Sequence, residues 1–530
     1  MLIFKRIFDS FTRKERAAFM VAAVLFALAA ITRGTLAVDD SSAWRAVSGG
    51  SWREGVVGQP VAINPLISDN AADLDLSTLI YSSLSDLAES YEVSEDGTEY
   101  TVKLREGIVW DNNQPITSDD VVFTVETVQD PTTRSPLTKN WKGVVTERVS
   151  ELRVIFTLPA PYAFFKENME RLPVLPVHLF GGIPKSNFRL SSYNLEPVGS
   201  GPYRLEDFSK RRDGFISEYH LVRNERFFGS KPFIKDFYFV FYESRELMMK
   251  DFALRKIQGF GSLSPVDTAS LPLRNAVVDR IPMPGYYALF FNENLSSSLK
   301  NNGLRRALAL AIDKREIVAQ VFHNEAEVVH GPLGKWGAGE TLAESENLNP
   351  EELKKENITL TLIVPQVDFL EETARIIKED WLTAGVRDVN IISLPTNELL
   401  ENVVKTNNYE VLLFGNVLEN PLDLFPFWHS SERFYPGLNL ALYKNQKVDT
   451  LIEKVRQSDE NGMLDLAKEA EKFIVEDNPA VFLFSLPYTY VHSKNLGGFQ
   501  FENENRPLVE PSDRFQKVEE WHLSKARVVK

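Results

Sequence analysis

Hydrophobic and polar residues alternate along two segments in the first third of the chain. In EYTVKLREGIVW (99–110) and RVIFTL (153–158), apolar residues recur at every second position over much of the segment. This period is typical of a β-strand with one buried face. Between them, PITSDDVVFTVETVQD (115–130) begins with proline, threonine and paired aspartates before an apolar run. Such an opening caps a helix and suits its dipole, so the pattern predicts a helix between two strands.

The second half of the chain combines helical and strand periods. Amphipathic helices are predicted for LRRALALAIDKREIVAQVF (304–322), 447–458 and 461–479. A strand (356–365), a helix ending at Gly385 (369–386) and a second strand (389–395) follow one another. That order predicts a parallel crossover unit in an α/β lobe. AVFLFSLPYTYVHS (480–493) predicts one further strand.

The N-terminal segment is apolar between basic flanks. Sixteen uncharged residues, Ala17 to Thr32, lie between Arg16 and Arg33. As a helix they span about 24 Å, slightly less than a bilayer core, and snorkelling arginines extend this reach. Five basic residues precede the apolar segment and one follows it, which predicts a cytoplasmic N-terminus and an exported body.

We therefore interpret residues 1–37 as a basic cytoplasmic segment with one transmembrane anchor, and residues 38–49 as a linker. A cleaved signal peptide is the alternative, since TLA (35–37) loosely resembles a cleavage site. Arg33 lies between the apolar segment and that site, which favours an uncleaved anchor. The body is then expected on the extracytoplasmic face of the cell membrane, and cleavage would make it periplasmic or secreted.

Length, charge and cysteine content narrow the class of protein. A body of about 490 residues exceeds one hydrophobic core, so two or three lobes are expected. The first 33 residues carry a net charge of +4, which leaves −19 on the remainder of a chain that totals −15. Nucleic-acid binding needs clustered basic residues, so the acidic body argues against such a partner. The absence of cysteine excludes disulfides, thiolate sites and a lipidated N-terminal cysteine.

Sequence motifs for catalysis and metal binding are mostly missing. HExxH, GxSxG, GxxxxGK and GxGxxG do not occur. Ser297 and Lys300 form an SxxK match in a polar run, whereas a Ser–Lys nucleophile needs a desolvated lysine. The seven histidines are dispersed, and none has a second ligand at zinc-helix spacing. The sequence therefore predicts no catalytic residue, no metal site and no cofactor.

The stretch FPFWHSSERFYPGLN (425–439) gathers aromatic residues with a histidine, two serines, a glutamate and an arginine. Aromatic side chains with polar groups often line a ligand cleft, and core packing is the alternative for each ring. His429 and Ser430 are adjacent, and adjacent residues on an extended chain point to opposite faces. They are therefore not expected to form a base–nucleophile pair, and we interpret the stretch as a ligand-facing wall.

One long run and several shorter ones occur in a characteristic order. The long run is LREGIVWDNNQPITSDDV (104–121), and the others are EGVVGQPVAINPL (54–66), VGSGPYRLEDF (198–208), YYALFFNEN (286–294) with LRRALALAIDKREIV (304–318), and NLALYKNQKVDTLIEKVRQS (439–458). Together they resemble solute-binding family 5, the extracytoplasmic binding proteins of peptide and nickel ABC transporters. The resemblance covers about Gly50 to Gly498. The chain is shorter than that family usually is between Leu84 and Ala88.

This resemblance implies an α/β fold of the two-lobed, periplasmic-binding-protein-like type II, with an extra inserted subdomain after the transmembrane helix. It assigns residues 50–72, 199–270 and 485–520 to lobe I, 73–198 to the inserted subdomain, and 271–484 to lobe II. Ligand is enclosed when the lobes close about a hinge. The binding protein itself makes or breaks no bond, and a membrane partner with an ATPase drives transport.

By the same resemblance, the ligand is an oligopeptide, captured by a monomer and delivered to ABC permease subunits. The expected ligand-binding residues are Val57, Gly58, Tyr287, Asn416, Trp428, His429 and Asn439. Peptide binders often hold the peptide's amino group with an aspartate, but that position is Val417 here, with Glu419 or Asp423 as substitutes. A receptor or sensor for another solute (metal complex, oligosaccharide), an anchored hydrolase and a purely structural surface protein remain the alternatives.

Overall fold

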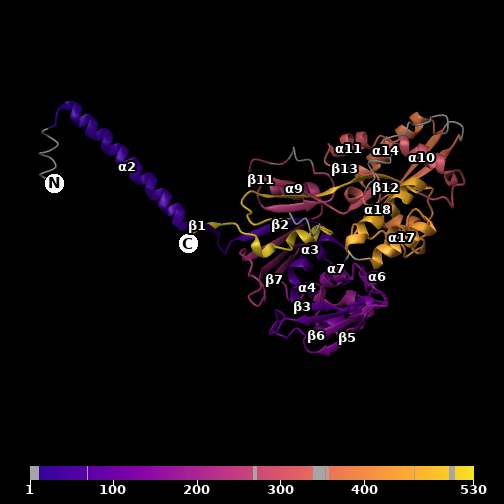
Figure 1. Cartoon of the computed structure of the whole chain (residues 1–530), viewed down its shortest axis with the longest axis horizontal. Helices are drawn as coiled ribbons and strands as arrows, with labels where there is room; N and C mark the ends of the chain where they lie inside the picture. The colour runs from indigo at the N-terminus through magenta and orange to yellow at the C-terminus, as the bar shows by residue number, and fades with distance from the viewer. Residues whose placement is uncertain are drawn as a thin grey trace.

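The N-terminal helix α2 (Arg13–Ser41) projects away from the body of the protein (Figure 1). The computed structural model describes residues 11–529 except 69, 267–270, 272, 338–352, 354–356, 459 and 501–507. Within α2, residues 13–33 form an apolar span with 0% of its length buried. A membrane anchor and a signal sequence both have this character.

The first sheet lies on the side of the body that faces α2 (Figure 1). Its described strands run in the order β11–β18–β10–β2–β9–β8–β7. Their bounds are β2 (Ser51–Val57), β7 (Tyr203–Lys210), β8 (Ile216–Arg223), β9 (Asp236–Tyr242), β10 (Gly259–Ser262), β11 (Ala276–Pro282) and β18 (Pro487–Ser493). β2 pairs in parallel with β9 and β10, so the first strand of the body is central and shielded on both edges.

The second sheet forms the core of the other lobe. Its described strands run β13–β17–β12–β16–β14–β15. Their bounds are β12 (Gly285–Phe291), β13 (Glu327–Val328), β14 (Thr359–Pro365), β15 (Asp388–Leu394), β16 (Val411–Val417) and β17 (Ala480–Ser485). β14 and β15 are parallel and are joined by α14 (Asp368–Ala384), which Gly385 ends at φ +116°. This confirms the predicted crossover unit.

The chain crosses between these two sheets through two short connections. β11 of the first sheet is followed by β12 of the second, and β17 of the second by β18 of the first. Segment 480–493, predicted as one strand, is therefore two strands in different sheets. Pro487 has no N–H to donate, and it begins the new strand as prolines in sheets often do. Residues 271–484 were expected in lobe II, yet β11 pairs along its whole length with β18 in the first sheet.

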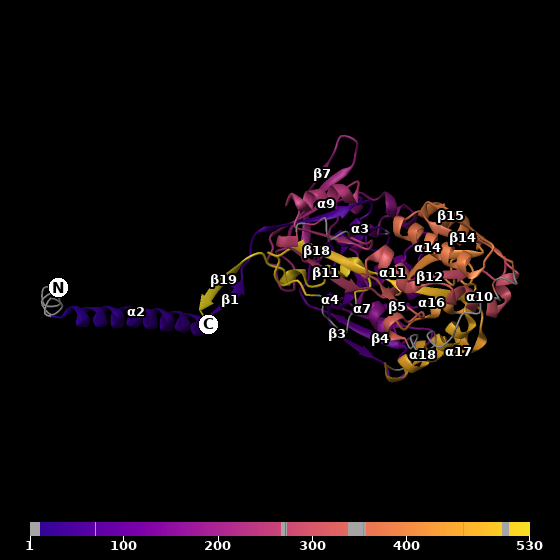
Figure 2. The same ribbon diagram turned by 90° about the horizontal axis from the view of Figure 1, so that it is seen from above.

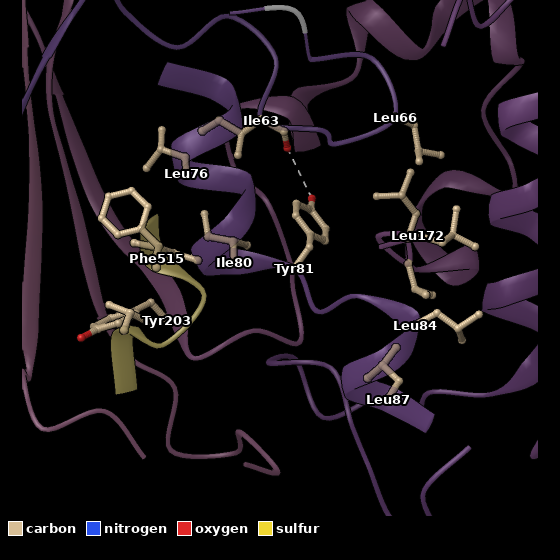
Figure 3. Packing of buried hydrophobic residues seen from close by; sticks show 14 of the residues in the cluster. Ile63, Leu66, Leu76, Ile80, Tyr81, Leu84, Leu87, Leu172, Tyr203 and Phe515 are labelled. Atoms are coloured by element: carbon tan, nitrogen blue, oxygen red, sulfur yellow. Dashed lines mark hydrogen bonds between the residues drawn. The ribbon is translucent and has the colours of Figure 1, made fainter. Parts of the chain in front are cut away.

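A smaller antiparallel sheet, with strand order β3–β4–β6–β5, packs beside the first one. Its strands are β3 (Ala88–Val93), β4 (Glu99–Leu104), β5 (Val145–Ser150) and β6 (Arg153–Thr157). The predicted helix is α5 (Ser118–Gln129), and Thr117 N donates to Asp120 Oδ2 at 2.8 Å, as its capping pattern predicts. Both sheets share one hydrophobic core. Figure 3 shows part of it, where Ile80 packs near Tyr203 and Phe515 from distant parts of the chain.

The remaining helices cover these sheets (Figure 2). They are α3 (Ala71–Ile80), α4 (Leu84–Leu87), α6 (Thr138–Trp141), α7 (Phe165–Glu170), α8 (Val177–Phe180), α9 (Arg245–Ala253), α10 (Asn302–Leu310), α11 (Lys314–Phe322), α15 (Thr396–Leu399), α16 (Phe425–Trp428), α17 (Gln446–Gln457) and α18 (Glu460–Asp477). Segment 304–322, with its continuous helical spacing, is divided between α10 and α11. Asp313 causes the break because its Oδ1 accepts from Glu316 N at 2.9 Å and so caps a new helix.

The predicted linker, residues 38–49, contains regular structure. α2 continues to Ser41, and β1 (Ser42–Ala46) pairs antiparallel with the C-terminal strand β19 (Lys525–Val529). Composition alone suggested a linker because small polar residues dominate this segment. Ala46 pairs with Lys525, about 480 positions later in the sequence, and the other pairs are farther apart. No local pattern reveals such a pairing.

Candidate functional site

A cavity of about 250 Å³ lies where the chain crosses between the two large sheets. Residues 282, 283 and 285 from the first crossing and 485–487 from the second border it. Loop residues 325–327, residues 333–336 and Leu418 contribute the rest of its wall, together with Arg280 and Tyr286. Ligand pockets usually hold about 300–1,000 Å³, so this cavity accommodates a small solute or one part of a larger one.

The rim of the cavity is charged and aromatic. Arg280 forms an ion pair with Glu325, and the ammonium group of Lys335 lies 4.7 Å from the ring centroid of Trp336. These groups offer both hydrogen bonding and a flat apolar surface. Such a combination fits a ligand that has polar and apolar parts.

Tyr286 lines the cavity and is held from behind by two donors. Asn416 Nδ2 and Trp428 Nε1 donate to Tyr286 Oη at 3.0 and 3.1 Å. All three residues are buried, and Trp428 is 0% exposed. Burial raises the pKa of the Tyr286 hydroxyl, so this group stays neutral. The structure therefore brings the predicted residues Asn416 and Trp428 together, as supports of a residue that the sequence analysis did not select.

Tyr287, the tyrosine that was expected to contact ligand, points away from this cavity. Tyr286 and Tyr287 are neighbours in β12, and successive strand residues face opposite sides of a sheet. The Tyr287 ring packs on Phe484 and Phe369, with centroid distances of 5.2 and 5.5 Å. The sequence pair YY contains no signal that says which ring faces the cavity, and sheet placement decides it.

Part of the stretch 425–439 is folded into the second lobe: Phe427, Trp428, His429 and Asn439 are buried, and other positions of the stretch are exposed. Trp428 lies inside the core of that lobe, so a direct contact with ligand has no support in this arrangement. Asn439 Nδ2 donates to the carbonyl oxygens of His429 and Tyr443 at 3.1 and 2.9 Å, which ties the stretch to itself. Of the aromatic residues in the stretch, Phe434 and Tyr435 are 60% and 61% exposed. Trp428 and Asn439 are thus packed supports, and a ligand contact by the exposed part of the stretch stays a prediction.

His429 also has a local packing role. Its ring stacks on Phe425 with a centroid distance of 4.1 Å, and its Nδ1 lies 2.8 Å from Ser431 Oγ. Ser430 Oγ donates instead to Asp449 Oδ2 at 2.6 Å. His429 Nε2 lies 3.3 Å from Glu453 Oε1 and 3.8 Å from Asp449 Oδ1, so both residues approach Asp449, and no hydrogen bond joins His429 to Ser430 in the described part of the chain. No group of three potential metal ligands occurs among the residues that the structure describes.

Val57 and Gly58 lie at the end of the central strand β2. Val57 is 43% exposed, and the N–H of Gly58 donates to the carbonyl of Tyr242 at 2.8 Å. Gly58 has φ +101°, which only glycine adopts readily. Neither residue borders the cavity in the described part of the chain. A ligand contact at this strand end stays a prediction.

Polar contacts join the inserted subdomain to the second lobe next to the cavity. Asn140 Nδ2 donates to Glu419 Oε2 at 2.5 Å, and Tyr162 Oη donates to Asp423 Oδ2 at 3.3 Å. Asp423 also accepts from Arg456 Nε and Nη2 at 2.9 and 2.7 Å. Its charge is therefore neutralised by a paired guanidinium. Glu419 and Asp423, the two alternatives for holding the peptide's amino group, thus differ in their electrostatic surroundings: Asp423 is paired with Arg456, and Glu419 accepts from an uncharged amide.

Glu419 lies near two other carboxylates, those of Glu510 and Asp513. Among the residues described, Glu419 is in no ion pair, and its carboxylate accepts from the amide of Asn140. Burial raises the pKa of Glu510, and the charges of Asp513 and Glu419 act in the same direction, whereas the charge of Arg171, which pairs with Asp513 at 3.1 Å, lowers it. Glu510 is exposed to solvent. The negative charges of Glu419 and Glu510 attract a cation to this region, and Arg171 offsets part of that attraction.

A buried ion network holds the C-terminal segment that carries Glu510. Arg514 donates to both oxygens of Asp75 at 2.8 and 2.6 Å and to Glu54 Oε1 at 3.1 Å. Glu54 Oε2 accepts from Trp52 and Tyr490 at 2.9 and 3.0 Å. Sequence reasoning missed this network because its members come from opposite ends of the chain.

Comparison with known proteins places this geometry in a family. Residues 84–433 match the model of bacterial extracellular solute-binding proteins, family 5. The oligopeptide-binding protein AppA of Bacillus subtilis is 23% identical over an alignment that covers 97% of this chain and 100% of AppA.

Two solved structures show the same fold. The structure of Bacillus subtilis AppA with a nonapeptide has a TM-score of 0.73 at 21% identity, and covers 91% of this chain and 100% of that one. NikZ of Campylobacter jejuni, in complex with Ni(L-His), has a TM-score of 0.71 at 22% identity, covering 89% and 99%. The match over residues 84–433 shows that the chain belongs to family 5 of the bacterial extracellular solute-binding proteins.

Proposed function

We propose that this protein is a peptide receptor of an ABC importer, which encloses an oligopeptide between its two lobes. The observation that carries the proposal is the cavity at the crossing of the two sheets, in a chain of this family. Relatives named for oligopeptide and dipeptide binding support the ligand class. The two crossings, at 283–284 and at Leu486, are the hinge about which the lobes close.

The receptor stays on the extracytoplasmic face of the membrane through α2 and passes its ligand to permease subunits. The unburied apolar span and its basic N-terminal flank support an uncleaved anchor. The receptor acts as a monomer and binds no nucleic acid, as its acidic body indicates. It has no catalytic role, because the permease and its ATPase supply the work.

Glu419 is the group that receives the amino terminus of the peptide. Asp423 is already paired with Arg456, whereas Glu419 accepts only from the amide of Asn140 among the described side chains. An ammonium group that binds near Glu419 and Glu510 relieves their mutual repulsion. A hydrogen bond to a charged group contributes about 1.5–3 kcal/mol, so Glu419→Gln should weaken binding by about tenfold to a hundredfold.

Native mass spectrometry of the full chain in mild detergent tests peptide capture. Co-purifying masses that are lost on unfolding and sequence as mixed peptides support the proposal. A chain that carries no peptide, and that no peptide pool stabilises against heat, refutes it. Bound masses that contain a metal or a sugar favour the alternative ligand classes, and the NikZ complex is the observation behind that second candidate.

Titration calorimetry with matched peptides tests the role of Glu419. Glu419→Gln should weaken binding of a peptide with a free amino terminus and leave its N-acetylated form unchanged. Glu401→Gln, at an exposed helical ion pair with Lys405, is the control and should affect neither peptide. Equal losses for both peptides would show that Glu419 does not recognise the amino group. Peptide turnover that disappears in Ser297→Ala or His429→Ala would instead support the hydrolase alternative.

A further inference from the structure

A two-stranded ribbon connects the membrane helix to the body. β1 follows α2 without a break, and β19 brings the C-terminal segment back beside it. Figures 1 and 2 both show this ribbon between α2 and the sheets of the body. An isolated pair of five-residue strands is marginally stable in water, so the ribbon gains from packing against another surface.

The register of the ribbon sorts its side chains onto two different faces. Trp44 is opposite Arg527, and Ala46 is opposite Lys525, so these four residues share one face. Arg527 Nε donates to Ser42 Oγ at 2.6 Å on that same face, which directs the guanidinium along it. The opposite face carries the pairs Ala43↔Val528 and Arg45↔Ala526. The first face thus combines tryptophan with two cations, and the ribbon strands contain no acidic residue.

Trp44 is 65% exposed, which is unusual for the largest side chain on a short ribbon. Tryptophan prefers the interface between lipid and water, and arginine and lysine bind phosphate groups there. The ribbon begins nine residues after Arg33, the end of the apolar span. At 1.5 Å per residue this places it about 13 Å beyond that end along a straight helix, and a tilted helix brings it into the headgroup layer.

We propose that the face of the ribbon with Trp44, Lys525 and Arg527 binds the phospholipid headgroups of the membrane that holds α2. This inference rests on the proposed uncleaved anchor. The contact replaces a single flexible tether with a stiff, doubly attached stalk that fixes the first lobe relative to the membrane. Each basic residue near an anionic surface contributes about a fivefold preference for the bound state. Asp39 and Asp40 precede the ribbon, and their negative charges oppose this attraction. Because the two cations are thus partly offset, the binding face also needs the aromatic contact of Trp44.

Site-specific labelling tests the contact, because the chain has no cysteine and each introduced thiol is unique. The full chain is reconstituted into vesicles of zwitterionic and anionic phospholipids that include lipids with a nitroxide on the headgroup. Fluorophores are attached at Ala46→Cys on the proposed binding face and at Ala526→Cys on the opposite face. Val149→Cys in β5 reports on the inserted subdomain. We expect strong quenching at position 46, weak quenching at 526 and none at 149.

A second variant separates this contact from simple proximity to the anchor. Trp44→Ser with Lys525→Glu leaves the bond between Arg527 and Ser42 in place, and should reduce quenching at position 46 to the level at 526. Equal quenching at 46 and 526 in the native sequence, in protein that floats with vesicles, overturns the inference. Protein that binds peptide but does not float overturns the anchor and this inference together, and leaves peptide capture standing.

Discussion

Replacement of Arg514 by methionine should strongly destabilise the first lobe. The guanidinium is buried between Asp75 and Glu54, whose residues are 3% and 0% exposed. Its loss leaves two carboxylates in the interior without their counterion, although Trp52 and Tyr490 still donate to Glu54. Removal of one partner from a buried ion network costs about 3–5 kcal/mol. This is a large part of the 5–15 kcal/mol by which folded domains are usually stable.

The loss should depend on pH in a defined direction. Burial raises the pKa of Glu54, and the charge of Arg514 partly offsets this shift. Without Arg514 the pKa rises further, so the folded variant takes up a proton at a pH where the unfolded chain does not. Such a group stabilises the fold at low pH, and this contribution is lost as pH rises through the folded pKa. The destabilisation should therefore be largest near neutral pH and should shrink toward pH 5.

Urea denaturation of the full chain in detergent, followed by fluorescence at several pH values, measures both effects. Arg211→Met is the matched control, because Arg211 pairs with Asp213 at 2.5 Å on the surface, with side chains 44% and 58% exposed. Exposed pairs contribute about 0–1 kcal/mol, so this variant should be close to the native protein. A cost below about 1 kcal/mol for Arg514→Met at neutral pH, or one that does not fall with acidification, would refute the reasoning.

Three further predictions follow from single contacts. Burial raises the pKa of Asp120 from 3.8 to about 6, so the stabilising protonated form is lost as pH rises through that value. In the native protein this lowers the free energy of unfolding by about 3 kcal/mol between pH 4 and 7, and Asp120→Asn should remove that fall from a series of urea denaturation curves. An unchanged pH dependence contradicts this prediction. Tyr286→Phe leaves two buried donors without an acceptor and should cost about 1–3 kcal/mol, measured by the urea midpoint. Gly199→Ala would place a Cβ 1.9 Å from the carbonyl oxygen of Ile80, so we expect little folded protein by circular dichroism, and native-like stability would contradict it.

The local elements of this protein could be read from its sequence. The alternation in 153–158, the cap before α5 and the glycine after α14 all act within a few residues, and each of these elements occurs, whereas the strand predicted over 99–110 ends at Leu104. The ordered motifs also indicated the family, which the match over 84–433 shows. Local patterning succeeds here because strand period, capping and helix termination depend on near neighbours.

The site depended on contacts that no local pattern contains. Tyr286 faces the cavity because β12 has its particular place in the second sheet, and Asp423 is neutralised because Arg456 folds against it. Trp428 belongs to a stretch whose composition is typical of a ligand wall, yet its side chain lies in the core of the second lobe. The sequence by itself thus determined many of the local elements, the apolar N-terminal span and the family. The tertiary structure decided which side chain faces which side and which charges are paired, because burial and Coulomb interactions depend on distance in space rather than along the chain.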